Sequence, residues 1–170
     1  MQAIIKAFWD IALFRQGPDS LPDSQPLLLL AAVAYAVIDV VVILTLYPSA
    51  ALAPLLLVDV GFMVAWCAGL LALFGKIARL RQTLTALFGT GALLQLLAYP
   101  VTAWPSFGLP IEMPMAFRVL ISLLILLWSV AVFGHIFGRA LSRSLGAGIS
   151  FAVIYYIVIY EVAAQWSRVS

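Results

Sequence analysis

The chain has 170 residues, of which 65% are hydrophobic and 9% are charged, and its formal net charge is +2. A soluble domain is about 25% charged, and one of this length buries only about 68–70% of its unfolded surface. This composition therefore excludes a water-soluble enzyme, a nucleic-acid-binding domain and a disordered linker protein, and it predicts an all-α integral membrane protein. No nucleic-acid partner is expected, because the basic residues are scattered at the ends of predicted helices and form no single face.

Residues 1–16 are predicted to form a short amphipathic helix on the cytoplasmic surface. Gln2, Lys6 and Asp10 recur every four residues, and the apolar side chains fall mainly on the other side. This spacing is typical of a helix that lies in the membrane interface. The segment would orient the first span as an anchor or, alternatively, serve as a docking helix for a soluble partner.

Residues 17–26 are predicted to form a linker with two successive turns. The linker contains a Pro-Asp-Ser motif followed by Leu-Pro-Asp-Ser. Proline presets the backbone for turns, and the Asp and Ser side chains can also cap the helix that follows.

The membrane domain is predicted to cover residues 27–166, followed by an outer tail at 167–170. A spanning helix needs about 20 mostly apolar residues. Five stretches meet this requirement: 27–47, 55–74, 83–104, 116–137 and 145–166. The predicted fold is therefore a bundle of five transmembrane helices behind a surface helix.

The distribution of basic residues predicts the orientation of the bundle. With a cytoplasmic N-terminus, seven of the nine Lys and Arg residues fall on the cytoplasmic side, and only Arg118 and Arg168 fall on the other. Cytoplasmic loops carry this excess of basic residues. We therefore expect a multi-pass protein of the cell inner (cytoplasmic) membrane with its N-terminus inside and its C-terminus outside.

Several ionisable side chains lie within the predicted spans. A charged group near the bilayer centre costs about 2.5–3.5 kcal/mol on insertion scales, which makes it a functional candidate. The four that fall in the outer half, and that would form a polar cluster if their helices face one another, are Asp39, Asp59, Arg118 and Glu161. Helical spacing adds a secondary polar lining of Gln95, Tyr99, Ser122 and Gln165.

Two interpretations of this cluster remain open. It could be a proton or cation site, or a pocket for a polar headgroup, with Asp39 and Asp59 close enough to share a proton. Alternatively, the charges are interhelical hydrogen-bonding groups, and those near the helix ends extend to the interface. Asp39 is too deep and too short to extend in this way, so it is the first residue to test.

Cofactor and enzyme chemistry find little support in the sequence. A lone His135 and a lone Cys67 cannot assemble a zinc site, and no cofactor is expected. The pair of Asp39 and Asp59 is similar to that of intramembrane aspartic proteases, but the expected Gly-x-Gly-Asp neighbourhood is missing. We therefore predict a protein that is not an enzyme.

The order of segments resembles the Yip1-type membrane domain. The shared features are a cytoplasmic N-terminal segment, a proline-rich approach and five closely spaced spans over most of the chain. The eukaryotic Asp-Leu-Tyr-Gly-Pro and Gly-Tyr motifs are absent, so no residue role is transferred. The resemblance implies a protein that organises membranes or adapts partner proteins without catalysis.

The sequence thus predicts a non-enzymatic scaffold or assembly factor, or an accessory subunit of a larger membrane complex. Its expected partners are the lipid bilayer and other membrane-protein subunits. The alternative is a small proton- or cation-coupled transporter or channel that uses the intramembrane carboxylates.

Overall fold

The structure, a computed structural model, describes residues 2–46, 52–107 and 113–169, with side chains described up to position 162 except those of 106 and 107. In these ranges the chain forms α-helices and short 3₁₀ turns, and no strand occurs in them. The α-helices are α1 (Gln2–Ala12), α2 (Gln25–Leu46), α3 (Leu52–Leu73), α4 (Leu80–Thr102), α5 (Met115–Leu141) and α6 (Leu145–Val169). The 3₁₀ turns are η1 (Pro18–Ser20), η2 (Ile77–Arg79) and η3 (Trp104–Phe107).

Five of these helices, α2 to α6, are long and apolar enough to cross a membrane. The chain is therefore an all-α, multi-pass type of membrane protein. The helices extend beyond some of the predicted spans where the sequence becomes polar. For example, α5 continues from the predicted end at position 137 to Leu141 and stops at Ser142, whose backbone is left-handed with a φ of 55°. Similarly, α6 continues to Val169 through most of the predicted 167–170 tail.

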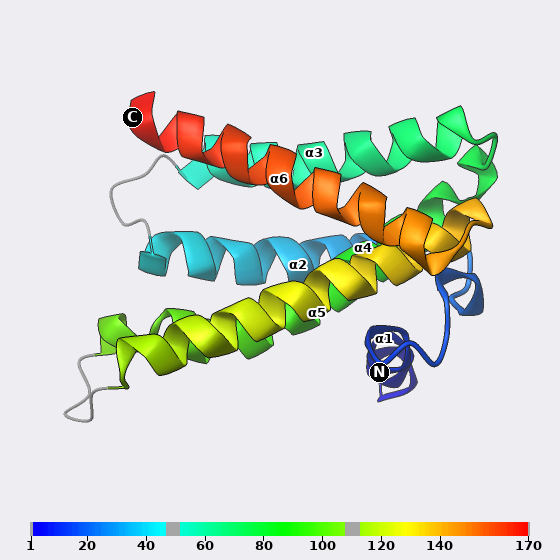
Figure 1. The fold of residues 1–170 in the computed structure, drawn as a ribbon. Helices are drawn as coiled ribbons and strands as arrows, with labels where there is room; N and C mark the ends of the chain where they lie inside the picture. The colour runs from blue at the N-terminus through cyan, green and yellow to red at the C-terminus, as the bar shows by residue number, and fades with distance from the viewer. Residues whose placement is uncertain (1, 47–51, 108–112, 170) are drawn as a thin grey trace.

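In the view of Figure 1, α3 and α6 lie above α2, α4 and α5. The most extensive contacts are between α5 and α6 and between α2 and α4. α1 is viewed nearly end-on in the same orientation, so it crosses the long helices at a steep angle.

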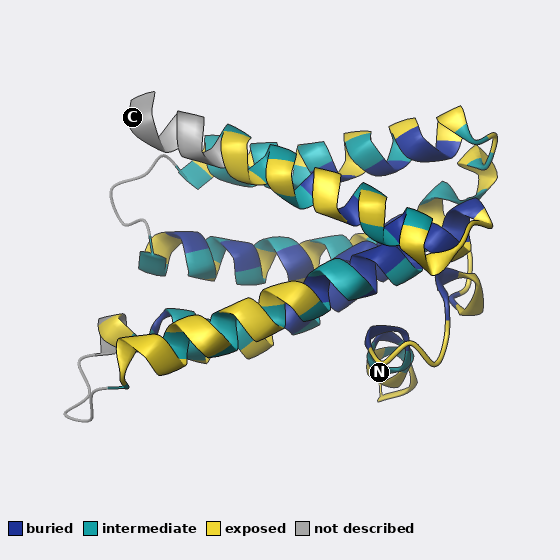
Figure 2. Cartoon of the chain, in the orientation of Figure 1, coloured by how far each residue is buried: buried dark blue, intermediate teal, exposed yellow. Residues whose placement is uncertain are grey.

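α4 is the central helix, which contacts α1, α2, α3 and α5, and one half of it is rich in small residues and threonines. Every residue from position 83 to position 92 is buried. The hydroxyls of Thr83, Thr85 and Thr90 donate to backbone carbonyls four residues earlier, at 2.7–2.8 Å, so burial leaves them satisfied. Figure 2 shows the buried residues concentrated in this half of α4 and α5, with more exposed residues toward the opposite end of α5.

Glycines allow α5 and α6 to pack closely next to the turn that joins them. A Cβ on Gly148 of α6 would collide with the Gly134 carbonyl and lie 2.6 Å from the Gly138 nitrogen of α5. Ala152, one turn after Gly148, is completely buried. The two helices are therefore held together at this end, and small residues are what make the contact possible.

The predicted amphipathic helix is present as α1, and it packs on the flank of the bundle against α4 and α5. Phe8 sits over Gly89 of α4, where any Cβ would collide with its ring. The indole nitrogen of Trp128 donates to the Ala12 carbonyl at 3.0 Å. Because its buried face is occupied by the chain itself, α1 fits the anchor interpretation better than the docking interpretation.

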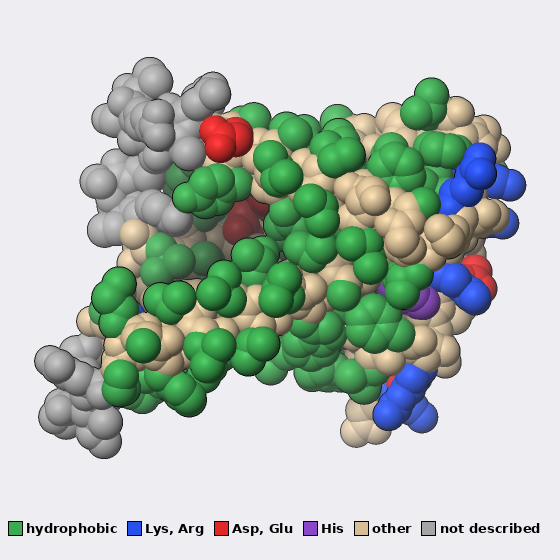
Figure 3. Space-filling view, in the orientation of Figure 1, with side chains coloured by type: hydrophobic (Ala, Val, Ile, Leu, Met, Phe, Trp, Pro, Cys, Tyr) green, Lys and Arg blue, Asp and Glu red, His purple; other side chains and the backbone are tan. Residues whose placement is uncertain are grey.

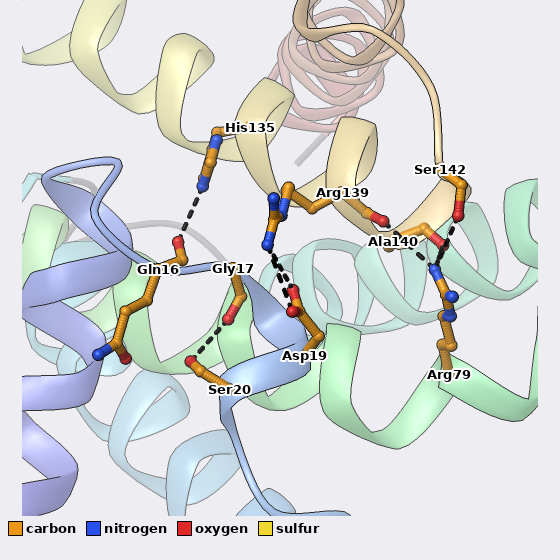
Figure 4. Close-up of polar contacts among 9 residues, drawn as sticks. All are labelled: Gln16, Gly17, Asp19, Ser20, Arg79, His135, Arg139, Ala140 and Ser142. Carbon is orange, nitrogen blue, oxygen red and sulfur yellow. Dashed lines mark hydrogen bonds and ion pairs between the residues drawn. The ribbon is translucent and has the colours of Figure 1, made fainter.

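The linker after α1 is held by ion pairs and hydrogen bonds at the end of the bundle where α5 and α6 are joined (Figure 4). Asp19 pairs with Arg139 of α5 at 3.3 Å, and Asp23 pairs with Arg81 of α4 at 2.9 Å. The predicted capping is made by Ser24, whose hydroxyl accepts a long, 3.5 Å hydrogen bond from the Leu27 amide. The two aspartates thus hold the linker against α4 and α5.

Hydrogen bonds also connect the C-terminus of α5, and the segment after α1, to neighbouring parts of the chain (Figure 4). Arg79 donates to the Ala140 carbonyl at 2.9 Å and to the Ser142 hydroxyl at 3.0 Å, which satisfies groups at the C-terminus of α5. A ring nitrogen of His135 lies 2.8 Å from the Gln16 carbonyl. The end of the bundle that carries Arg79, Arg81 and Arg139 is named the basic end, and blue side chains gather there in Figure 3. These contacts make it the more tightly connected end of the bundle.

Candidate functional site

A cleft of about 280 Å³ lies among α2 to α6, in the half of the bundle away from the basic end. Each of the five helices contributes a side chain to its wall: Tyr35, Asp59, Gln95, Ser122 and Tyr155. Figure 3 shows a hollow between α5 and α6, with acidic side-chain atoms visible inside it. α5 and α6 pack closely at the glycine contact, and their residues are less buried beyond it. The looser packing beyond the contact leaves room for the cleft.

The first acid of the site is Asp59 on α3. Its Oδ2 accepts a 2.6 Å hydrogen bond from the hydroxyl of Tyr35 on α2. Tyr35 is buried, with 5% of its surface exposed, while Asp59 is partly buried and lines the cleft. A short bond to an ionisable acceptor is among the stronger hydrogen bonds in proteins.

The second acid is Asp39 on α2, which lies beside the cleft wall with 7% of its surface exposed. Its Oδ1 accepts a 3.3 Å hydrogen bond from the side-chain amide of Gln95, which does line the cleft. Asp39, Asp59 and Gln95 are each seven residues from the helix end away from the basic end. At 1.5 Å per residue this is a common depth of about 10 Å, and the helices that carry the two carboxylates, α2 and α3, are in contact.

Aromatic rings form the opposite wall of the cleft. Tyr155 and Tyr156 of α6 and Phe133 of α5 line it, with the Phe133 ring centroid 5.8 Å from that of Tyr155 and 5.6 Å from that of Tyr156. Tyr155 also stacks on Phe62 of α3 at 5.4 Å. The cleft therefore combines a carboxylate with several π faces, which is an environment that suits a cation.

Arg118, the predicted basic member of the cluster, makes no ion pair with either acid among the described residues. Its side chain lines a neighbouring hollow of about 380 Å³ between the ends of α4 and α5. The ion pairs found in the described part of the chain are instead at the basic end and involve Asp10, Asp19 and Asp23. Ser122 lines both the cleft and this hollow, so the two spaces adjoin along α5.

Two further predicted site residues, Glu161 and Tyr99, do not line the cleft. Glu161 is exposed, because it is two residues, about 200°, beyond the lining residue Ile159 on α6. The hydroxyl of Tyr99 lies 3.1 Å from that of Thr45 and helps join α4 to α2. The side chain of Gln165 is not among the described ones.

The tyrosines of the site are functional candidates that the sequence prediction missed. Tyr35 is one helical turn before Asp39, so the two share a face of α2. Tyr155 and Tyr156 lie in the interior of an apolar run, whereas membrane tyrosines concentrate at the interfaces. Their central position was a signal that could have identified them.

The described residues include no group of three or more His, Cys, Asp or Glu side chains placed to hold a metal ion. Two carboxylates with tyrosine, serine and amide neighbours can bind a cation through electrostatics and hydrogen bonds. The chain matches no protein-family model, no curated protein and no solved structure. The resemblance to the Yip1-type domain therefore stays a prediction.

Proposed function

We propose that this chain is a non-enzymatic protein of the cytoplasmic (inner) membrane that binds a cation in the cleft and acts as a small cation-coupled transporter. Its basic end faces the cytoplasm, as the excess of Lys and Arg at that end favours. The cleft then lies in the outer half of the membrane.

The observation that carries this proposal is that two carboxylates lie at the cleft, Asp59 in its wall and Asp39 beside the wall, bonded to Gln95. Asp39 and Asp59 come from adjacent helices and lie at the same depth. A lone charged acid near the bilayer centre costs about 2.5–3.5 kcal/mol on insertion scales, and such residues mark ion and substrate paths. A cation held between them would offset their mutual repulsion.

A second candidate function is that of a scaffold, assembly factor or accessory subunit. It is favoured by the sparse packing of α3 and α6, since only 17% of the most apolar window of each helix is buried within the chain. These faces could contact another membrane-protein subunit as well as lipid. Affinity purification in a mild detergent tests this candidate, because an accessory subunit should co-purify with a defined membrane partner.

Uptake into proteoliposomes tests the transport proposal. The purified chain should take up labelled methylammonium or Na⁺ above the level of protein-free vesicles, or move protons when a pH gradient is imposed. Asp59→Asn should lower this flux at least tenfold, because it removes the carboxylate that lines the cleft. Glu161→Gln is the matched control, since it removes an exposed acid on α6 that does not line the cleft.

Two results would count against transport. Flux that Asp59→Asn leaves unchanged would mean that the cleft is not the path. No flux of any of the three cations, together with a single co-purifying membrane partner, would favour the accessory-subunit function instead.

A further inference from the structure

The cleft and the hollow that contains Arg118 form adjoining parts of one surface. Thr102, Ser122 and Leu126 line both of them. On α5, Arg118 is one turn before Ser122, and Ser129 continues the same stripe two turns further into the cleft. A ligand that enters the cleft can therefore extend along α5 to the guanidinium group of Arg118.

The polar atoms that lack a partner differ in kind between the two parts. Near the carboxylates, Oδ2 of Asp39 and Oε1 of Gln95 are buried acceptors that no donor reaches among the described residues. In the neighbouring hollow, Nε of Arg118 is a buried donor that no acceptor reaches within the same part of the chain. Buried polar atoms are normally hydrogen-bonded, so each of these three atoms needs an explanation.

The unpartnered acceptors indicate that the part of the site near the carboxylates lacks a hydrogen-bond donor. Asp39 is more than nine-tenths buried, and Gln95 holds it at the cleft wall. A primary ammonium group carries a positive charge and three N–H donors, so it can satisfy a carboxylate and further acceptors together. A quaternary ammonium has no N–H donor and would leave the acceptors unpartnered.

The unpartnered donor indicates that the hollow around Arg118 lacks a hydrogen-bond acceptor. Arg118 presents a planar guanidinium group, which binds phosphate through paired hydrogen bonds. Ser122 adds a hydroxyl to the same wall. A phosphate in the hollow would provide the acceptor that Nε of Arg118 lacks.

We propose that the site binds a primary ammonium joined by a short linker to a phosphate, which is the chemistry of phosphoethanolamine. The ammonium lies between Asp59 and Gln95, beside Asp39 and against the aromatic wall, and the phosphate lies at Arg118. The proposal rests on the cation binding proposed above and specifies which cation it is. The unit can come from a phospholipid headgroup that enters through the opening between α5 and α6, or from the free compound.

Binding measured by calorimetry on the purified chain in phosphatidylglycerol nanodiscs tests this assignment. The soluble probes are phosphoethanolamine, ethanolamine and phosphocholine, and the lipid probe is phosphatidylethanolamine added to the nanodiscs, followed by its retention on repurification. We expect phosphoethanolamine, or the lipid that carries it, to bind at least tenfold more tightly than ethanolamine or phosphocholine. Retention of the lipid without binding of free phosphoethanolamine would identify the lipid as the source.

Variants separate the two halves of the site. Arg118→Gln should abolish the advantage of phosphoethanolamine over ethanolamine, whereas Arg118→Lys should keep part of it. Asp59→Asn should weaken both compounds at least tenfold. Glu161→Gln and Lys76→Gln are controls for loss of charge away from the site, and thermal unfolding of each variant shows that it is folded.

The outcomes distinguish this inference from the proposed function. If ethanolamine and phosphoethanolamine bind equally and Arg118→Gln changes neither, the phosphate half is wrong while cation binding stands. If no amine and no aminophospholipid binds, this assignment is wrong as a whole. If, in addition, the chain carries no flux of Na⁺, methylammonium or protons above that of protein-free vesicles, the proposed function is wrong as well.

Discussion

Tyr35 on α2 donates a 2.6 Å hydrogen bond to Asp59 on α3, and this bond joins the two helices beside the cleft. Its donor is buried, so replacement by phenylalanine would leave the carboxylate oxygen without this donor. The loss of a partner from a buried polar group costs about 1–3 kcal/mol.

We therefore expect Tyr35→Phe to lower the free energy of unfolding in detergent by an amount in that range. Tyr160→Phe is the matched control, because Tyr160 is 73% exposed on α6 and its hydroxyl is outside the cleft. Equal stability of the Tyr35 and Tyr160 variants would mean that the bond does not contribute to the fold.

The contact between α5 and α6 gives a second prediction. Gly148→Ala places a methyl group against the backbone of α5, so the helices must separate. Overpacking of this kind costs about 1–3 kcal/mol. Thermal unfolding should show a clear loss of stability for Gly148→Ala and none for Gly146→Ala, since a Cβ at Gly146 meets open space. Similar melting of the two variants would contradict the glycine contact.

The packing of α1 gives a third prediction. Gly89→Ala would push the Phe8 ring away from α4 and loosen α1. Backbone amides of α1 should then exchange with deuterium at least tenfold faster, while those of α4 remain protected. Gly69→Ala is the control, because no atom lies within 4 Å of its added Cβ. Unchanged exchange in α1 would show that the ring moves without releasing the helix.

The helices were largely predictable because hydrophobicity alone determines which segments can cross a bilayer. Ranges of about 20 apolar residues identified the five spans, and the four-residue polar spacing identified α1. Helix ends were less predictable, since α5 continues past the charged Arg139 until Ser142 adopts a left-handed backbone. Hydropathy responds to charge, whereas the helix end depends on the local backbone.

The site was predictable in part. The sequence placed Asp39 and Asp59 in the outer half of adjacent spans and added Gln95 by helical spacing. In the structure the three residues lie equally far from the ends of their helices, and Gln95 contacts Asp39. Depth does not determine which way a side chain points, and Glu161, which was grouped with them, is exposed and does not line the cleft. That direction depends on the rotation of α6, which the glycine contact with α5 helps to set.

Five crossings would place the two ends of the chain on opposite sides of the membrane, with the cleft in the outer half. Single cysteines introduced into a Cys67→Ser background, and treated with a membrane-impermeant maleimide in intact cells, measure this directly. Cysteines at Met113 and Ser170 should react from outside, and those at Gln2 and Ser144 only after permeabilisation. Reaction of Gln2→Cys and Ser170→Cys from the same side would contradict five crossings and the placement of the cleft.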